Sequence, residues 1–261
     1  MPEYVEVKIM SEFINDKVSD KKFDKIFDVV KGNIPNEFQL SEGDFRIVAE
    51  SNGKELVLNV YHDVASFKIS VFMGMSGNWK FVQTDKWNET KFVRMRMDTT
   101  DGWSLLLYGG YMGPKYKLGG FTGVKRGPDP LKENDKFKKG VLDNIGCKEF
   151  DKPLGESLLN QKYFNGIGAY LLAEIVGRLD YNPHRTINQL CNKELEDLFN
   201  MIVRCFEESY SFGGGEIKDW QNPFGENRID EWLMFYNNKE ICYKQKFGTR
   251  NIWIHKKWKT T

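Results

Sequence analysis

Hydrophobic positions near the start of the chain recur with the period of a helix. Within residues 5–18, apolar side chains recur every three or four positions, at Val7, Met10, Ile14 and Val18. Phe13 lies next to Ile14. An α-helix has 3.6 residues per turn, so these side chains fall on one face. The pattern predicts an amphipathic helix over residues 5–18.

After this helix the apolar positions fall into short stretches rich in β-branched and aromatic residues, which is typical of strands. These stretches are residues 45–49, 55–61, 66–72, 92–97 and 104–108. Asn52-Gly53, Gly77-Asn78 and Asp101-Gly102 supply turn signals between them. We therefore expect an antiparallel β region up to about residue 120, and then a linker rich in Gly, Pro and Lys at residues 119–140.

From about residue 152 the pattern becomes helical again. Helices are predicted at residues 157–164, 169–179 and 192–210, and the Asn182-Pro183 pair ends the second of them. A capping box formed by Thr186 and Gln189 predicts a short turn before the third. The third helix carries one apolar side, made of Leu195, Leu198, Phe199, Ile202 and Phe206. After the glycines at 213–215, two strand-like runs close the chain, at residues 232–236 and 251–255. This order of elements predicts an α+β protein.

Charge is distributed unevenly along the 261 residues. The chain has 38 Lys and Arg against 37 Asp and Glu, a net charge of +1. Residues 232–261 hold seven basic residues and one acid, a net +6, so the other 231 residues carry −5. Tyr243, Phe247, Trp253 and Trp258 are interleaved with the basic residues of this tail. Such a tail suits contacts with phosphates and bases, although charge alone fits a solvated lysine-rich hairpin equally well.

Several classes of protein are excluded or disfavoured by composition. No apolar run approaches the 18 residues of a transmembrane helix, and the N-terminus, MPEYVEVKIM, does not resemble a secretory leader. The four cysteines, Cys147, Cys191, Cys205 and Cys242, lack the paired spacing of a zinc site. We expect free, buried thiols, no metal and no other cofactor.

The first residues hold the clearest candidate chemistry. Removal of the initiator Met would leave Pro2 as a free secondary amine, and an α-amino group has a pKa of about 7.7–8.0. Such an amine attacks a carbonyl or acetal carbon to form an iminium. Glu3 and Glu6 stand beside it as a general acid or base. The structural alternative is a helix N-terminus that begins with Pro and acids, which favour the helix dipole.

Six further motifs follow in a fixed order. They are SNGKELVLNV (51–60), FMGMSGNW (72–79), RGPDPL (126–131), LLNQKYFNGIGAYLLAEIVGRLDYNPHR (158–185), FGGGEIKDW (212–220) and KFGTRNIWIH (246–255). With Pro2 and Glu3, this series resembles the Fpg/Nei family, the formamidopyrimidine-DNA glycosylases and endonuclease VIII-like enzymes, over almost the whole chain. The resemblance implies an N-terminal helix-flanked antiparallel β-sandwich, a helical domain with a helix–two-turn–helix motif, and a C-terminal β-hairpin finger.

The resemblance also implies domain boundaries. Residues 1–125 would form the β-sandwich catalytic domain and 126–151 a linker. Residues 152–231 would form the helix–two-turn–helix domain, with a loop near 212–226 that covers an everted base. Residues 232–261 would form the finger. Only Cys242 lies near a zinc-ligand position of the family, so the finger resembles the zincless version.

The family's site residues map onto particular positions of this chain. Pro2 falls on the nucleophile and Glu3 on the acid that assists sugar-ring opening. Lys54 falls on a lysine that contacts phosphate and helps the lyase step, and Arg250 on the finger arginine that binds phosphates. The remaining matches are the supporting acids Glu6 and Glu174, the gap-filling Met75 and Met112, and the DNA-binding Gly166, Gly168, Lys162 and Lys246.

The chain departs from the family pattern at three places. The usual opening P-E-G-P-E is Pro2-Glu3-Tyr4-Val5-Glu6 here. The family's gap-filling Arg and Phe correspond to Gly110 and Met112, so a direct hydrogen bond to the base opposite the lesion is not expected. The phosphate-binding Asn after the G-x-G turn is Ala169, which removes one contact worth about 1.5–3 kcal/mol.

Taken together, these residues predict a monomeric, intracellular enzyme, nuclear or nucleoid-associated if cellular in origin. Its partner is damaged DNA, duplex or single-stranded, and not a membrane. Its expected activity is that of a bifunctional DNA glycosylase/AP lyase of base excision repair. It would remove oxidised bases through a Schiff base on Pro2 and cleave the strand by β,δ-elimination. The alternative is a non-catalytic DNA-damage-binding protein on the same scaffold, which Gly110 and Ala169 favour and the retained Pro2 and Glu3 oppose.

Overall fold

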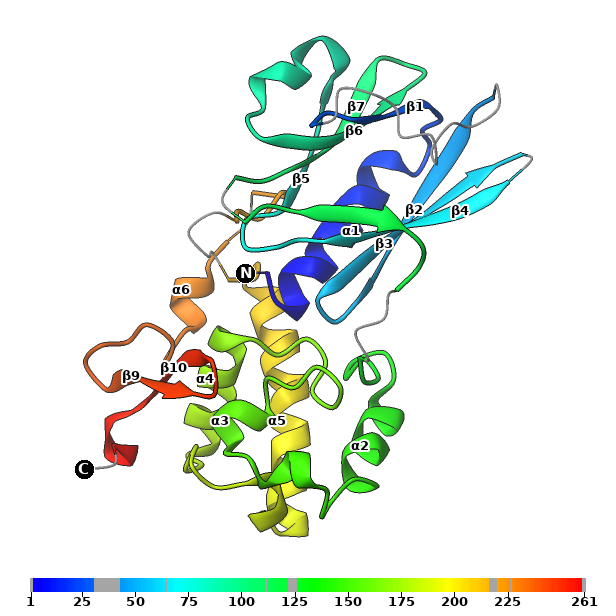
Figure 1. Ribbon diagram of the computed structural model, residues 1–261. Helices are drawn as coiled ribbons and strands as arrows, with labels where there is room; N and C mark the ends of the chain where they lie inside the picture. The colour runs from blue at the N-terminus through cyan, green and yellow to red at the C-terminus, as the bar shows by residue number, and fades with distance from the viewer. Residues whose placement is uncertain are drawn as a thin grey trace. The chain divides into compact units, whose positions relative to one another are not determined.

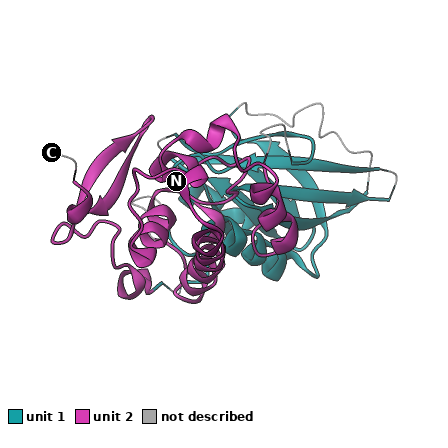
Figure 2. Ribbon diagram, turned by 90° about the horizontal axis from the view of Figure 1, so that it is seen from below, with its two compact units in different colours: residues 1–2, 6–123, 216–227 teal, residues 3–5, 124–215, 228–261 magenta. Residues whose placement is uncertain are grey.

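The computed structural model describes residues 2–30, 43–63, 65–110, 112–121, 126–215, 220–225 and 227–259. The chain divides into two compact units (Figure 2). Unit 1 contains residues 1–2, 6–123 and 216–227, and unit 2 contains residues 3–5, 124–215 and 228–261. Of the predicted loop near 212–226, residues 216–219 and 226 lie outside the described residues.

Unit 1 combines most of one helix with an antiparallel sheet (Figure 1). Its elements are α1 (Tyr4–Val18), β1 (Phe23–Asp28), β2 (Phe45–Asn52), β3 (Glu55–His62), β4 (Ser66–Phe72), β5 (Asn78–Gln83), η2 (Thr84–Glu89), β6 (Val93–Thr99), β7 (Trp103–Tyr108) and β8 (Lys115–Leu118). The strand order is β5-β7-β6-β1-β2-β3-β4-β8. β1 and β2 share a single Cα pair, Phe23 with Phe45. The sheet therefore divides into two four-stranded halves, the two layers of a β-sandwich.

The apolar stripe of α1 explains why this helix forms and where it packs. Val7, Met10 and Ile14 are fully buried, which confirms the predicted face. The Asn15 side chain extends the contact, because it accepts the Ala49 N–H of β2 at 2.8 Å and donates to the Ala49 carbonyl at 2.9 Å. The predicted strands are also present. β1, β5 and β8 were not predicted, because polar residues interrupt their short apolar patterns.

Unit 2 is mainly helical and ends in a hairpin. Its elements are α2 (Asn134–Leu142), η3 (Lys148–Asp151), α3 (Leu154–Ser157), α4 (Ala169–Leu179), η4 (Ile187–Gln189), α5 (Asn192–Ser211), α6 (Ile229–Trp232), β9 (Cys242–Phe247), β10 (Arg250–His255) and η5 (Lys256–Trp258). α4 has the predicted bounds, and α5 buries its predicted apolar side. The expected capping box is present at the start of η4, between the N-cap residue Thr186 and Gln189. The described helices include none long and apolar enough to cross a membrane.

Three local predictions were wrong, each for a physical reason. The segment predicted as a linker contains α2, which buries Phe137 and Val141. A helix was predicted at 157–164, but turns follow the short α3. There the Asn160 side chain accepts the Lys162 N–H at 3.1 Å and competes with helical bonding. Residues 232–236 do not form a strand, because their backbone N–H groups bind a buried carboxylate described below.

Candidate active site

The carboxylate of Glu3 binds the N-terminus of α4 within unit 2. Glu3 is 3% exposed. Its Oε2 accepts the Gly168 N–H at 2.6 Å and the Leu171 N–H at 3.4 Å, and its Oε1 accepts the Tyr170 N–H at 3.1 Å. The first N–H groups of a helix have no partner inside the helix, and the helix dipole favours an anion there. These bonds fix both carboxylate oxygens of the residue that follows Pro2.

The two glycines of the turn before α4 leave space for this arrangement. A Cβ at Gly168 would lie 2.2 Å from the Glu3 carboxyl carbon. Gly166 has φ +97°, and a Cβ there would lie 2.7 Å from the Tyr4 ring. The Gly166 N–H donates to Gln161 Oε1 at 3.0 Å, so intramolecular acceptors bind the N–H groups of both glycines. Their phosphate-binding role stays a prediction.

Tyr4 is a positioning residue that sequence reasoning missed. Its hydroxyl donates to Asp129 Oδ1 at 2.9 Å, and its ring stacks on Phe206 with ring centroids 4.4 Å apart. Its N–H donates to the Gly166 carbonyl at 3.1 Å. Asp129 is the acid of the RGPDPL motif and is also buried. Two sequence signals for this role were available: the RGPDPL motif, and the replacement of the family's Gly by Tyr4. The contacts of Tyr4 with Asp129, Phe206 and Gly166 hold residues 3–5 in unit 2.

Glu174, one of the predicted supporting acids, organises the chain that leads into the hairpin. It is fully buried in α4. Its Oε1 accepts the N–H groups of Phe235 at 2.8 Å and Tyr236 at 2.9 Å, and both of its oxygens lie 3.1 Å from the Met234 nitrogen. Arg178 Nε donates to its Oε2 at 3.2 Å. Buried carboxylates need such partners, and here they set the path of residues 234–236.

The β9–β10 hairpin presents two predicted DNA-binding residues. Its two-residue turn contains Gly248, with φ +55°, and the exposed Lys246 and Arg250 flank the turn. Phe247 anchors the hairpin. A Cβ at Gly155 would lie 2.7 Å from the Phe247 ring, and the His184 ring centroid is 5.1 Å from that of Phe247.

The base of the hairpin is apolar. Cys242 clusters with Ala173 and Trp253, and Phe235 and Tyr236 pack against this cluster. Burial, together with the neighbouring Glu174 carboxylate, raises the pKa of the Cys242 thiol to about 11. Across the described ranges, no group of three or more His, Cys, Asp or Glu side chains is placed to hold a metal ion.

The remaining thiols are free and differ in exposure. Cys205 is buried, and burial raises its pKa to about 12. Cys147 is half-buried and Cys191 is exposed at the N-cap of α5. The expectation of free thiols is confirmed, whereas the expectation that all four are buried was wrong. Cys191 is exposed because it caps a surface helix.

Unit 1 carries the other predicted site residues. The half-buried Lys54 occupies the two-residue turn between β2 and β3 with Gly53, whose φ is +56°. Met75 and Met112 share a hydrogen bond, since the Met75 N–H donates to the Met112 carbonyl at 2.9 Å. Glu6 is fully buried in the first turn of α1. Pro2 also belongs to unit 1.

Comparisons with known proteins agree with one family. The profile of the formamidopyrimidine-DNA glycosylase N-terminal domain matches residues 1–109. Human endonuclease 8-like 1 is 27% identical over 290 aligned positions, which cover 97% of this chain and 72% of the human protein. The mouse endonuclease 8-like 1 is 30% identical, over 70% of this chain and 49% of its own length.

Solved structures show the same fold over the full chain. Wild-type Lactococcus lactis Fpg, in a complex with DNA that contains an oxidised pyrimidine, matches with a TM-score of 0.81 at 16% identity and covers all of both chains. MutM in a complex with DNA that contains carbocyclic 8-oxo-G matches with a TM-score of 0.80 at 17% identity. In sequence and in fold, the chain is therefore similar to proteins of the Fpg/Nei family.

The predicted site residues of the chain fall into two sets, one in each unit. Unit 2 holds Glu3, Gly166, Gly168 and Glu174 around α4, together with Lys162, Lys246 and Arg250. Lys162 Nζ donates to the Tyr163 hydroxyl at 2.7 Å. Unit 1 holds Pro2, Glu6, Lys54, Met75 and Met112.

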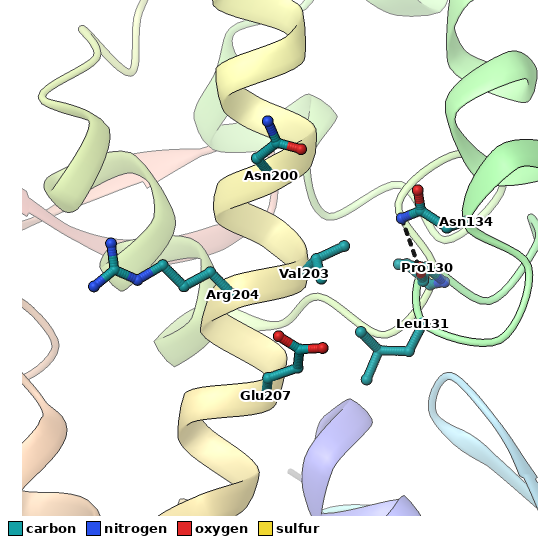
Figure 3. A pocket seen from close by; sticks show the side chains of 7 residues that line it. All are labelled: Pro130, Leu131, Asn134, Asn200, Val203, Arg204 and Glu207. Carbon is teal, nitrogen blue, oxygen red and sulfur yellow. Dashed lines mark hydrogen bonds between the residues drawn. The ribbon is translucent and has the colours of Figure 1, made fainter.

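A cavity of about 320 Å³ lies elsewhere in unit 2, between α5 and residues 130–134 (Figure 3). Its lining residues are Pro130, Leu131, Asn134, Asn200, Val203, Arg204 and Glu207. The Asn134 side chain donates to the Pro130 carbonyl at 3.0 Å across one end of it. The lining includes none of the predicted site residues.

Proposed function

We propose that the protein is a bifunctional DNA glycosylase and AP lyase that excises oxidised bases through a Schiff base on Pro2. The observation that carries the proposal is the position of the Glu3 carboxylate, which three N–H groups of the α4 N-terminus fix by hydrogen bonds. Glu3 directly follows Pro2 in the sequence. A protein that only bound DNA would not need a free amine beside a fixed carboxylate. The Fpg/Nei fold and the relatives named above support the same class of enzyme.

The reaction follows from the chemistry of an N-terminal secondary amine. Once Met1 is removed, the Pro2 nitrogen attacks C1′ of the damaged nucleotide, the bond from C1′ to the base breaks, and the base leaves with a proton. Glu3, as a carboxylic acid, gives a proton to O4′; the C1′–O4′ bond then breaks, which leaves a hydroxyl on the opened sugar and a cationic iminium at C1′. The Glu3 carboxylate stabilises this cation and assists ring opening, since opposite charges attract strongly in a site with little water.

Strand cleavage then proceeds by two eliminations. Loss of a C2′ proton from the iminium expels the 3′ phosphate, and a second elimination expels the 5′ phosphate. Water finally hydrolyses the iminium and frees the Pro2 amine. Lys54 contacts phosphate and helps these lyase steps, while Glu6 and Glu174 support the site.

Damaged DNA is the proposed partner, and the protein acts as a monomer without a cofactor. A base inside a duplex must be extruded before chemistry, at a cost of a few kcal/mol. Met75 and Met112 fill the space that the base leaves, because flexible apolar side chains replace lost stacking. Arg250, Lys246 and Lys162 supply cations for the phosphates. The solved Fpg and MutM complexes named above contain damaged DNA.

Borohydride trapping tests the mechanism. Wild-type protein, Pro2→Gly and Glu3→Gln are incubated with oligonucleotides that carry an abasic site, oxidised purines, oxidised pyrimidines or hydantoins, as duplex and as single strand. Wild type should form a covalent adduct, Pro2→Gly should lose it, and Glu3→Gln should form it more slowly. Glu12→Gln, at a half-buried position of α1 where the side chain pairs with Lys8, is the matched control and should behave as wild type.

Two results would count against this proposal. Equally poor trapping by wild type and Pro2→Gly would show that the proposed mechanism is wrong. Intact-mass measurement of a retained Met1, together with damage-specific DNA binding and no incision, would favour the alternative of a non-catalytic damage-binding protein, which Gly110 and Ala169 suggest.

A further inference from the structure

Two large apolar side chains of unit 1 are exposed on an unfavourable backbone. Phe92 is 66% exposed with φ +60°, and Met112 is 62% exposed with φ +45°. Large side chains rarely adopt positive φ, and strained residues persist where the surrounding structure holds them and function uses them. Burial does not explain either residue, so the surroundings must supply the reason.

Phe92, Met75 and Met112 are exposed apolar residues on backbone segments that lie close together, and we call them the apolar tip. The Gly109 N–H donates to the Phe92 carbonyl at 3.1 Å, and the Met75 N–H donates to the Met112 carbonyl at 2.9 Å. A Cβ at Gly110 would lie 3.5 Å from Cδ2 of the Phe92 ring. The tip residues therefore lie on the turn at 73–77, at residue 92 and beside the described residues 109–110 and 112–114.

Close backbone packing keeps the tip in place. A Cβ at Gly74 would lie 2.1 Å from the Met112 carbonyl oxygen, and a Cβ at Gly113 would lie 2.4 Å from that of Gly109. These glycines allow the segments to approach so closely that the strained residues have little freedom. The Phe92 ring is thus presented to solvent next to these closely packed segments, beside Gly110, which has no side chain.

The charges that lie near the tip residues in the sequence indicate what the tip contacts. Residues 73–79, 91–94 and 109–117 contain four cations and no acid. They are Lys91, Arg94, Lys115 and Lys117. Cations beside an exposed aromatic ring suit a nucleic acid, whose phosphates bind the cations while a base stacks on the ring.

We propose that Phe92 stacks on the base opposite the lesion in duplex DNA. This inference rests on the proposed function, in which Met75 and Met112 fill the gap on the damaged strand. The opposite base then has no pairing partner, and its flat face matches the flat phenyl ring. Because a phenyl ring neither donates nor accepts conventional hydrogen bonds, Phe92 holds any of the four bases. Gly110 has no side chain that could form a hydrogen bond with the opposite base. The protein should therefore accept any of the four bases opposite the lesion.

A two-by-two binding experiment tests the contact. Dissociation constants are measured for wild type and Phe92→Ala on duplexes with a tetrahydrofuran abasic analogue opposite adenine and opposite a second tetrahydrofuran. Phe92→Ala should weaken binding to the first duplex by about 5- to 150-fold, the range for loss of one base–aromatic stack. It should change binding to the second duplex by less than about twofold, because the base that the ring contacts is absent.

Two variants complete the design. Phe92→Trp keeps an aromatic face and should retain wild-type binding. Phe121→Ala, which removes another exposed aromatic of unit 1, should bind both duplexes as wild type does. Equal melting temperatures for wild type and Phe92→Ala exclude unfolding as the cause.

Equal binding of the first duplex by wild type and Phe92→Ala would overturn this inference alone, and so would equal losses on both duplexes. A wild-type protein that bound neither duplex would overturn it together with the proposed function.

Discussion

Gly168→Ala should disable the site through one methyl group. Gly168 has φ −128° and ψ −158°, so its backbone tolerates alanine. The new Cβ would lie 2.2 Å from the Glu3 carboxyl carbon, whereas ordinary contact begins at 3.4 Å. The carboxylate must therefore withdraw by 3.4 − 2.2, or 1.2 Å. The 2.6 Å bond from the Gly168 N–H then becomes too long to hold.

The expected losses follow from this displacement. Loss of one hydrogen bond to a charged group costs about 1.5–3 kcal/mol of folding stability, partly offset by about 0.4–1 kcal/mol from the lower chain entropy of alanine. Misplacement of a reacting group by about 1 Å costs about 100-fold in rate. Urea unfolding and single-turnover excision of an oxidised base measure the two effects.

Two further variants make the test specific. Gly140→Ala in α2 is the control, because its Cβ would meet Pro128 no closer than 4.0 Å, and it should leave excision unchanged. Glu3→Asp in the Gly168→Ala background shortens the acid and should recover part of the lost rate. Excision by Gly168→Ala at the wild-type rate would refute the role assigned to the Glu3 carboxylate.

Three other changes probe separate parts of the molecule. Tyr4→Phe removes the hydroxyl that bonds Asp129 and should lower both stability, by about 1.5–3 kcal/mol, and excision. Tyr181→Phe, which removes a hydroxyl bonded to a carbonyl in the same unit, should lower stability alone; equal excision by the two variants would contradict the positioning role. Arg185 lowers the pKa of Glu194 from 4.5 to about 2, so their ion pair stabilises the fold above pH 4.5 and is lost as the pH falls towards 2. Glu194→Gln should cost about 1 kcal/mol at pH 7, discounted for solvent exposure, and nothing near pH 2, as urea unfolding at both pH values would show. Arg250→Ala should weaken DNA binding on every sequence and reduce the salt slope by about one, and an unchanged slope in a salt titration would exclude a phosphate contact.

Helices with clear periodicity were predicted well from the sequence, and segments governed by single side chains were not. α4 has the predicted bounds because its apolar positions keep helical spacing up to the residues before Pro183. The strand expected at 232–236 fails because Glu174, about 60 residues earlier, binds the backbone N–H groups of that segment. No local pattern records a partner so far away in the chain.

The candidate site shows the same division. Glu3 was identified by its place beside Pro2, but its attachment to the α4 N-terminus required coordinates. Tyr4 was seen only as a departure from the family pattern, although it bonds a residue 125 positions away. Phe92 carried no sequence signal, because an exposed phenylalanine is recognised only from its environment and backbone angle.

The assignment of residues 3–5 to unit 2, between parts of the chain that belong to unit 1, bears on how the protein can be divided. A fragment that starts at residue 126 would lack the acceptor for the first N–H groups of α4 and the aromatic partner of Phe206. A fragment of residues 1–125 would keep Pro2 but leave Glu3 without its helix. We expect neither fragment to be an autonomous module. Exchange of this helical unit between relatives should succeed only when the first five residues are exchanged with it.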